Sequence, residues 1–157
     1  MNLPDNILEY MIIKHEGIRL KVYTDTKGIP TIGVGRNLRD RGISNEEALY
    51  LLQNDLRACL IQLQTLPFWG ALNNTRQRVL VDMCFNLGYN GLMNFKKTLQ
   101  YIKDGEYGKA SLEMLNSKWA KEVGNRATEL SDMNEEGRIA WKKKKGLVAE
   151  TKNVRIA

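Results

Sequence analysis

The chain has 157 residues, of which 43% are hydrophobic and 27% are charged, with a formal net charge of +6. This length suits one domain with one or two small cores, and the balance of apolar and charged residues excludes a disordered chain. The positive charge favours a polyanionic partner, such as nucleic acid, an anionic membrane surface or an anionic wall polymer, without choosing among them. Two cysteines, Cys59 and Cys84, are too few for a disulfide scaffold and are expected to be buried free thiols. With a single histidine they argue against a zinc site.

The first residues predict a helix. Leu8, Met11 and Ile12 repeat at helical spacing, and a capping box of Asn6 with Glu9 predicts a helix over residues 6–16 that the next glycine ends. His15 is expected to pack on a face of this helix. The segment lacks the basic and long apolar regions of a secretory signal, and no stretch is long enough for a membrane span, so synthesis in a cytoplasm is expected.

The pattern then changes to the period of two that is typical of strands. Ile18, Leu20 and Val22 alternate with polar neighbours, and a turn over residues 24–28 separates them from a second strand around Thr31. Two glycines interrupt that second strand, Gly33 and Gly35, which predicts a bend or a close approach of the backbone. We therefore expect a small hairpin lobe over about residues 17–43.

A long helix follows the hairpin. Ser44 and Glu47 form a second capping box, and the apolar periodicity continues over about residues 45–65, where Pro67 ends it. At 1.5 Å per residue such a helix spans roughly 30 Å, which is enough to join two lobes.

The rest of the chain predicts a helical lobe over about residues 68–145, on which helix 6–16 packs. Trp119 lies in a short segment before Gly124, and other apolar residues at helical spacing mark four further helices: Val79, Leu80, Met83, Cys84 and Leu87; Phe95, Leu99 and Ile102; Ala110, Met114 and Leu115; and Ala127, Leu130 and Met133. Residues 146–157, after the run of lysines at 142–145, show no periodicity and are expected to be poorly ordered. The expected fold class is a single α+β domain that is mainly α.

Two carboxylates frame the predicted hairpin. Glu16 ends the first helix, and Asp25 lies in the turn nine residues later. Glycoside hydrolysis requires such a pair, because one carboxyl gives a proton to the leaving oxygen while the other stays ionised. Partial burial against neighbouring isoleucines would favour the protonated form of Glu16, whereas the polar turn would keep Asp25 ionised. Both residue types are also common on plain surfaces, so this pattern alone leaves the catalytic interpretation open.

The complete motif, HEGIRLKVYTDTKGIPTIGVG, resembles the catalytic signature of the phage-type lysozymes, the muramidases of glycoside hydrolase family 24. Glu16, Asp25 nine residues on and Thr31 six further on all match the spacing of that signature. The likeness continues in VDMCFNLG at 81–88, in SKW at 117–119 and in NRA at 125–127. It implies a lysozyme-like fold, in which a small β-hairpin lobe and a larger helical lobe are joined by a long helix.

The resemblance also implies roles for individual residues. Glu16 is implied as the general acid, and Asp25 and Thr31 as the residues that place the attacking water. Arg126 would pair with Glu16 across a cleft and support the site. Four further positions match those that contact sugar in the T-even relative: Asn37, Phe85, Thr98 and Glu113. Neither a metal ion nor a cofactor is implied.

One position departs from the family pattern. Arg36 stands where a histidine commonly follows the Gly-Val-Gly segment. We predict that Arg36 pairs with Asp55 on the long helix, because a guanidinium forms such a pair bidentately and does not titrate near neutral pH.

The implied activity is that of a monomeric endolysin, which cuts the β-1,4 bond between N-acetylmuramic acid and N-acetylglucosamine in peptidoglycan. Such an enzyme acts on the cell wall after a holin releases it, without stable membrane insertion. Two alternatives remain at this point: a lytic transglycosylase, and a non-catalytic cationic protein that binds walls or acts on membranes. Asp25 and Thr31 argue against the first, and scattered basic residues argue against binding of nucleic acid.

Overall fold

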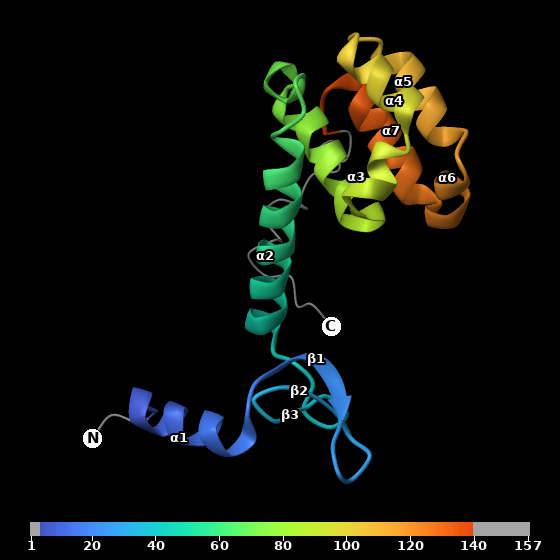
Figure 1. Ribbon diagram of the computed structural model, residues 1–157. Coiled ribbons are helices and arrows are strands. Elements are labelled where there is room, and N and C mark those ends of the chain that lie inside the picture. Colours follow the sequence, from blue (N-terminus) through green and yellow to red (C-terminus); the bar gives the residue numbers. More distant parts are fainter. Residues whose placement is uncertain (1–3, 140–157) are drawn as a thin grey trace. The chain divides into compact units, whose positions relative to one another are not determined.

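The computed structural model describes residues 4–139. The chain forms two compact units, Met1–Tyr50 and Leu51–Ala157 (Figure 1). The described residues contain seven α-helices, one 3-10 helix and three short strands. This confirms the predicted α+β class in which helices predominate. The lysines at 142–145 and the tail at 146–157 lie outside the described residues.

The first unit begins with helix α1, Asn6–Glu16, which has the predicted bounds. Its N-cap is Asp5 rather than Asn6, because Asp5 has the extended backbone of a cap and its carboxylate accepts a hydrogen bond from the Leu8 N–H at 2.9 Å. Gly17 ends the helix at φ 75°, a left-handed value that favours glycine. No residue of α1 is buried. The packing of this helix on the helical lobe joins the two units and stays a prediction. The packing of His15 on the helix face also stays a prediction, since His15 is exposed in this unit.

Three strands follow α1 and form one antiparallel sheet in the order β1-β2-β3. Strand β1 is Arg19–Thr24, β2 is Pro30–Gly33 and β3 is Arg36–Asn37. Thr31, on the central strand, pairs with Tyr23 on one side and with Asn37 on the other. The first two strands were predicted, whereas β3 was not, because two residues are too few to show a period.

Helix α2, Asn45–Leu63, carries the predicted capping box. The Ser44 N–H donates to the Glu47 carboxylate at 2.8 Å, and the Glu47 N–H donates to the Ser44 hydroxyl at 3.1 Å. The helix ends at Leu63, slightly before the predicted position, and a turn through Pro67 leads to the 3-10 helix η1, Trp69–Ala71.

Five helices complete the second unit: α3, Asn74–Met93; α4, Lys96–Lys103; α5, Tyr107–Leu115; α6, Lys118–Val123; and α7, Asn125–Glu136 (Figure 1). They enclose one hydrophobic core, whose members with no exposed surface are Leu63, Val79, Leu80, Met83, Leu92, Ala110 and Met114. As predicted, the helix that begins at Asn74 is interrupted at Gly88, where the backbone turns at φ 73° and ψ 161°; a further helical segment follows this kink within α3. Both cysteines are buried and free, as predicted.

The beginning of α3 is fastened to the end of α7. The Asn73 amide donates to the Gly137 carbonyl at 3.0 Å, and the Arg76 guanidinium donates to the Asn134 and Glu135 carbonyls at 2.7 and 3.0 Å. The same guanidinium lies over the Tyr107 ring, 3.4 Å from its centroid. One arginine thus binds carbonyl groups that the end of α7 would leave without helical partners.

Candidate functional site

The turn after β1 joins Asp25 to Thr31 through the backbone of Ile29. One carboxylate oxygen of Asp25 accepts the N–H groups of Lys27 and Ile29 at 2.8 and 2.9 Å. The Ile29 carbonyl in turn accepts the Asp25 N–H at 3.0 Å and the Thr31 hydroxyl at 2.9 Å. Two backbone donors therefore fix the Asp25 carboxylate, and the structure brings these two predicted site residues together.

The second carboxylate oxygen of Asp25 accepts no hydrogen bond from residues 4–50. The side chain is half-buried, so this oxygen is able to bind a water or a substrate group. An ionised carboxylate accepts hydrogen bonds strongly, which is the property required of a residue that positions a nucleophilic water.

Glu16 lies against the opposite end of the sheet. Its carboxylate approaches Gly35 so closely that a Cβ atom on Gly35 would lie 3.1 Å from Oε2. Gly35 also has φ 65°, which an L side chain rarely adopts. This confirms the predicted close approach at Gly35 but not at Gly33, and it places the predicted acid beside the turn between β2 and β3. Glu16 itself is exposed, so the predicted partial burial was wrong for this unit.

Thr31 is the one buried residue among residues 4–50, with 4% of its surface exposed. It lies between the two carboxylate positions, because its strand runs from the Asp25 turn toward Gly35. Its hydroxyl proton is donated to Ile29, so its oxygen retains lone pairs that can accept from a water.

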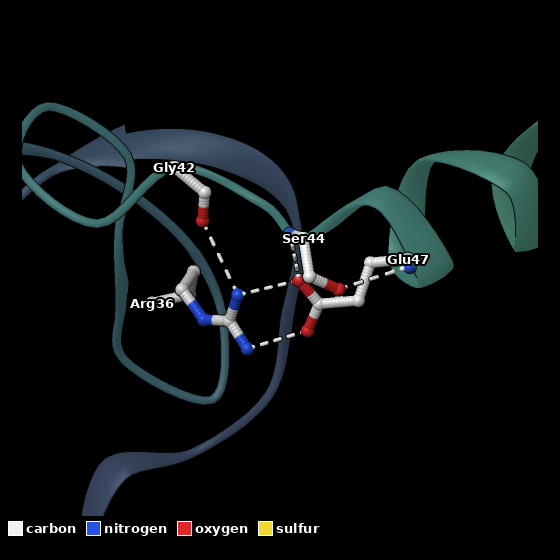
Figure 2. Close-up of polar contacts among 4 residues, drawn as sticks. All are labelled: Arg36, Gly42, Ser44 and Glu47. Carbon is white, nitrogen blue, oxygen red and sulfur yellow. Dashed lines mark hydrogen bonds and ion pairs between the residues drawn. The ribbon is translucent and has the colours of Figure 1, made fainter. Parts of the chain in front are cut away.

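Arg36 does not pair with Asp55, and that prediction was wrong. Both terminal nitrogens of its guanidinium bind the Glu47 carboxylate, at 2.8 and 2.6 Å, and one of them also donates to the Gly42 carbonyl (Figure 2). The capping box explains this choice, because it holds Glu47 in the first turn of α2, where β3 presents Arg36. The hydrogen bond from Arg36, together with that from the Ser44 N–H, lowers the pKa of Glu47 to about 2.

Asn37 is engaged within its own turn. Its amide nitrogen donates to the Asp40 carboxylate at 2.9 Å, and its amide oxygen accepts the Asp40 N–H at the same distance. Asn37 therefore stabilises the turn over residues 38–41 and is half-buried there. The contact with sugar that the resemblance implies would involve the exposed part of its side chain.

In the second unit, Thr98 and Glu113 line one cavity of about 780 Å³. The lining is mixed, with Phe95 and Trp119 beside polar residues such as Asn94 and Lys97. The two aromatic rings meet edge to face with centroids 5.9 Å apart. Thr98 is buried and Glu113 is half-buried, so Glu113 is the more accessible of the two predicted contacts.

Phe85 is separate from that cavity. It is 43% exposed and lines a smaller cavity of about 300 Å³ with Cys59, Cys84 and Gly88. A helical phenylalanine with this exposure is available to a ligand, and the structure does not place it in the core.

Arg126 forms an ion pair with Asp82, in which the guanidinium Nε donates to the carboxylate at 2.7 Å. Asp82 belongs to the VDMCFNLG motif that resembles the family, but the sequence predicted no role for this residue. The predicted pairing of Arg126 with Glu16 joins residues of two units and stays a prediction.

Among residues 4–139, no three potential ligands of the His, Cys, Asp or Glu type come together as a metal site would need. None of the described helices is both long and apolar enough to cross a membrane.

Comparison with protein families gives a match to the model for phage lysozyme over residues 13–136. That range contains Glu16, Asp25 and Thr31, the four predicted sugar contacts and Arg126.

Among individual proteins, the chain is 30% identical to the pre-baseplate central spike protein Gp5 of Enterobacteria phage T4 over 82% of its own length, but it spans 27% of that protein. It is 25% identical to probable T4-type lysozyme 1 of Dictyostelium discoideum, of which it covers 94%. It is also 35% identical to the endolysin of Salmonella phage P22 over 48% of this chain and 56% of the endolysin.

Proposed function

Because this chain belongs to the phage lysozyme family, we propose that it hydrolyses the β-1,4 bond between N-acetylmuramic acid and N-acetylglucosamine in bacterial peptidoglycan. Glu16 is the general acid, and Asp25 with Thr31 places the attacking water. The observation that carries the proposal is the arrangement of the two carboxylates on one sheet, with Glu16 against Gly35 and Asp25 fixed by two backbone N–H groups at the other end of β2.

The resemblance to the T-even kind of this family implies an inverting mechanism. Inverting glycosidases keep their carboxyls about 6.5–9.5 Å apart, so that a water fits on the far face of the sugar. We therefore propose direct attack by water, without a covalent intermediate.

In the proposed reaction, Glu16 gives its proton to the oxygen of the leaving sugar as the bond breaks. The free oxygen of Asp25 and the Thr31 hydroxyl hold the water, and Asp25 takes the proton that the water loses. Asn37, Phe85, Thr98 and Glu113 are the proposed substrate contacts, and Arg126, which forms an ion pair with Asp82, is the proposed supporting partner of Glu16.

We further propose that the protein acts as an endolysin: a monomer that reaches the wall after a holin-type lesion in the inner membrane. The net charge of +6 suits a wall polymer with acidic groups. No cofactor, nucleic acid or stable membrane insertion enters the proposal.

The test is digestion of purified peptidoglycan, with the fragment ends identified by mass spectrometry. The wild type is expected to give reducing N-acetylmuramic ends, and Glu16→Gln none, because a carboxamide has no acidic proton to give. Glu9→Gln is the matched control, since Glu9 is an exposed carboxylate on the same helix. Anhydro ends would instead identify a lytic transglycosylase, and an antibacterial effect that survives Glu16→Gln without fragments would identify a cationic binding or membrane-active protein.

A further inference from the structure

Two thiols that the proposed mechanism does not use lie together in the second unit. Cys59 on α2 and Cys84 on α3 are 9% and 2% exposed and belong to the same buried cluster. They also line the same cavity of about 300 Å³. The 157 residues contain two cysteines, so each is the other's sole possible disulfide partner within this sequence.

The environment of the two thiols affects the pKa of Cys84. Burial, together with a hydrogen bond to the thiol of Cys59, raises the pKa of Cys84 to about 12. Since the thiolate is the reactive form of cysteine, this environment makes the Cys84 sulfur slow to react at neutral pH. Two buried cysteines that line one small cavity nevertheless meet the first requirement of a disulfide, which is that the two side chains lie near each other.

We propose that Cys59 and Cys84 form an intramolecular disulfide in an oxidising environment and thereby bind α2 covalently to α3. The bacterial periplasm is such an environment. The inference goes beyond the proposed function and does not depend on it, since it concerns neither Glu16 nor Asp25.

The oxidant is a low-molecular-weight disulfide such as oxidised glutathione. The thiolate of Cys59, the more exposed residue, attacks one sulfur of the oxidant and expels one glutathione thiolate. The thiolate of Cys84 then attacks the Cys59 sulfur and expels the second. One S–S bond forms in the protein, one is broken in the oxidant, and the two thiol protons end on the two released glutathiones.

The position of the bond gives it a structural effect. The cavity that contains both thiols is also lined by Phe85 and by Gly88, where α3 is kinked. A disulfide beside the kink would hold this part of α3 against α2 and limit changes in the kink angle. Phe85, a proposed substrate contact, directly follows Cys84 and would be held with it.

The experiment measures how readily the full-length chain forms the bond when folded and when unfolded in urea. The chain is equilibrated in buffers with graded ratios of reduced to oxidised glutathione, and mass spectrometry detects the loss of two hydrogens and the linked peptides. Equilibrium is approached both from reduced protein and from protein oxidised in urea and then refolded, so that the slow reaction of the buried thiols does not affect the result.

We expect the effective concentration of one thiol at the other to be at least about tenfold higher in the folded chain than in the unfolded chain. By linkage, a tenfold ratio means that oxidation stabilises the fold by about 1.4 kcal/mol, which a shift of the urea midpoint should reproduce. Cys59→Ser and Cys84→Ser are the matched controls, each of which should form mixed disulfides without the bridge. The proposal would be overturned if the effective concentration of one thiol at the other were equal or lower in the folded chain than in the unfolded chain. Mixed disulfides with glutathione on both cysteines, without the bridge, would also overturn it.

Discussion

At the scale of single residues, the close approach of Glu16 to Gly35 has the most direct consequence. A methyl group on Gly35 would meet the Glu16 carboxylate and would also require a strained backbone. Gly33 has a similar φ, 69°, but a methyl group there would meet nothing within 4 Å. The two glycines therefore separate the backbone effect from the effect on the carboxylate.

We expect Gly35→Ala and Gly33→Ala to lose similar stability, about 1–2 kcal/mol each, because both force alanine into the left-handed region. Gly35→Ala alone should also reduce the rate of peptidoglycan hydrolysis strongly, since it displaces the proposed acid. Urea unfolding and turbidity assays on wall preparations measure the two effects. Equal rates for the two variants would contradict the assignment of Glu16 to its position over Gly35.

Thr31 offers a second test at this scale. Thr31→Val keeps nearly the same buried shape but removes the hydroxyl, whereas Thr31→Ser keeps the hydroxyl and removes a methyl group. If the hydroxyl places water, the valine variant should lose most of its activity, and the serine variant should keep activity while losing stability. The reverse order, in assays of hydrolysis and of thermal unfolding, would show that Thr31 acts only as a packing residue.

The pair of Arg36 with Glu47 predicts a pH effect. The pKa of Glu47 in the fold, about 2, lies below its ordinary value of 4.5. The stabilisation from the ionised carboxylate is thus fully present above about pH 4.5 and is lost as the pH falls through about 2. Between these values, the wild type should lose stability more steeply than Glu47→Gln. Glu46→Gln, which changes the exposed neighbouring carboxylate, should follow the wild type; a Glu47→Gln curve parallel to the wild type would contradict the shifted pKa.

At the scale of elements, the sequence predicted helices and strands well where local signals mark their ends. Helix α1 has the predicted bounds because an acceptor side chain precedes it and Gly17 follows it. Strand β3 was missed because two residues carry no period, and the partner of Arg36 was missed because Glu47 had been assigned to the capping box alone. One carboxylate serves both purposes, since Oε2 accepts from Ser44 as well as from Arg36.

The candidate site was predictable as a set of residues but not as an arrangement. The spacing of Glu16, Asp25 and Thr31 identified them, because it matches a family signature. The connection of Asp25 with Thr31 runs through main-chain atoms of Ile29, which any residue type could supply, so no sequence signal marks it. The pair of Asp82 with Arg126 joins residues far apart in the sequence and depends on how α7 packs against α3.

The kink in α3 gives a prediction at the element scale. Gly88 has a backbone conformation that is essentially restricted to glycine, with φ 73° and ψ 161°. Gly88→Ala should therefore destabilise the chain by about 1–3 kcal/mol. Gly70→Ala is the control, because Gly70 has no left-handed φ and open space around its Cβ position. Equal urea midpoints for the two variants would show that α3 can straighten at no cost.

At the scale of the whole molecule, the two units differ in how much they bury. Thr31 is the one buried residue among residues 4–50, whereas residues 51–139 contain a contiguous hydrophobic core. We expect amides of α3, α5 and α7 to exchange with deuterium at least about a hundredfold more slowly than those of the sheet, because exchange follows local stability. Hydrogen exchange followed by mass spectrometry tests this, and equal protection would mean that the first unit has a stability independent of the burial described.

The bonds from Asn73 and Arg76 to the end of α7 have a consequence for how this polypeptide can be combined with others. Between Asn73 and Gly137 the chain makes five helices and returns to its starting point, where the two residues share a hydrogen bond of 3.0 Å. When the first and last residues of a helical segment lie side by side, the two residues of a host chain that flank it can also stay close together. This closeness of the ends favours insertion into another protein. The two ends of residues 73–137 would therefore not force apart the two strands of a carrier chain into which they were inserted.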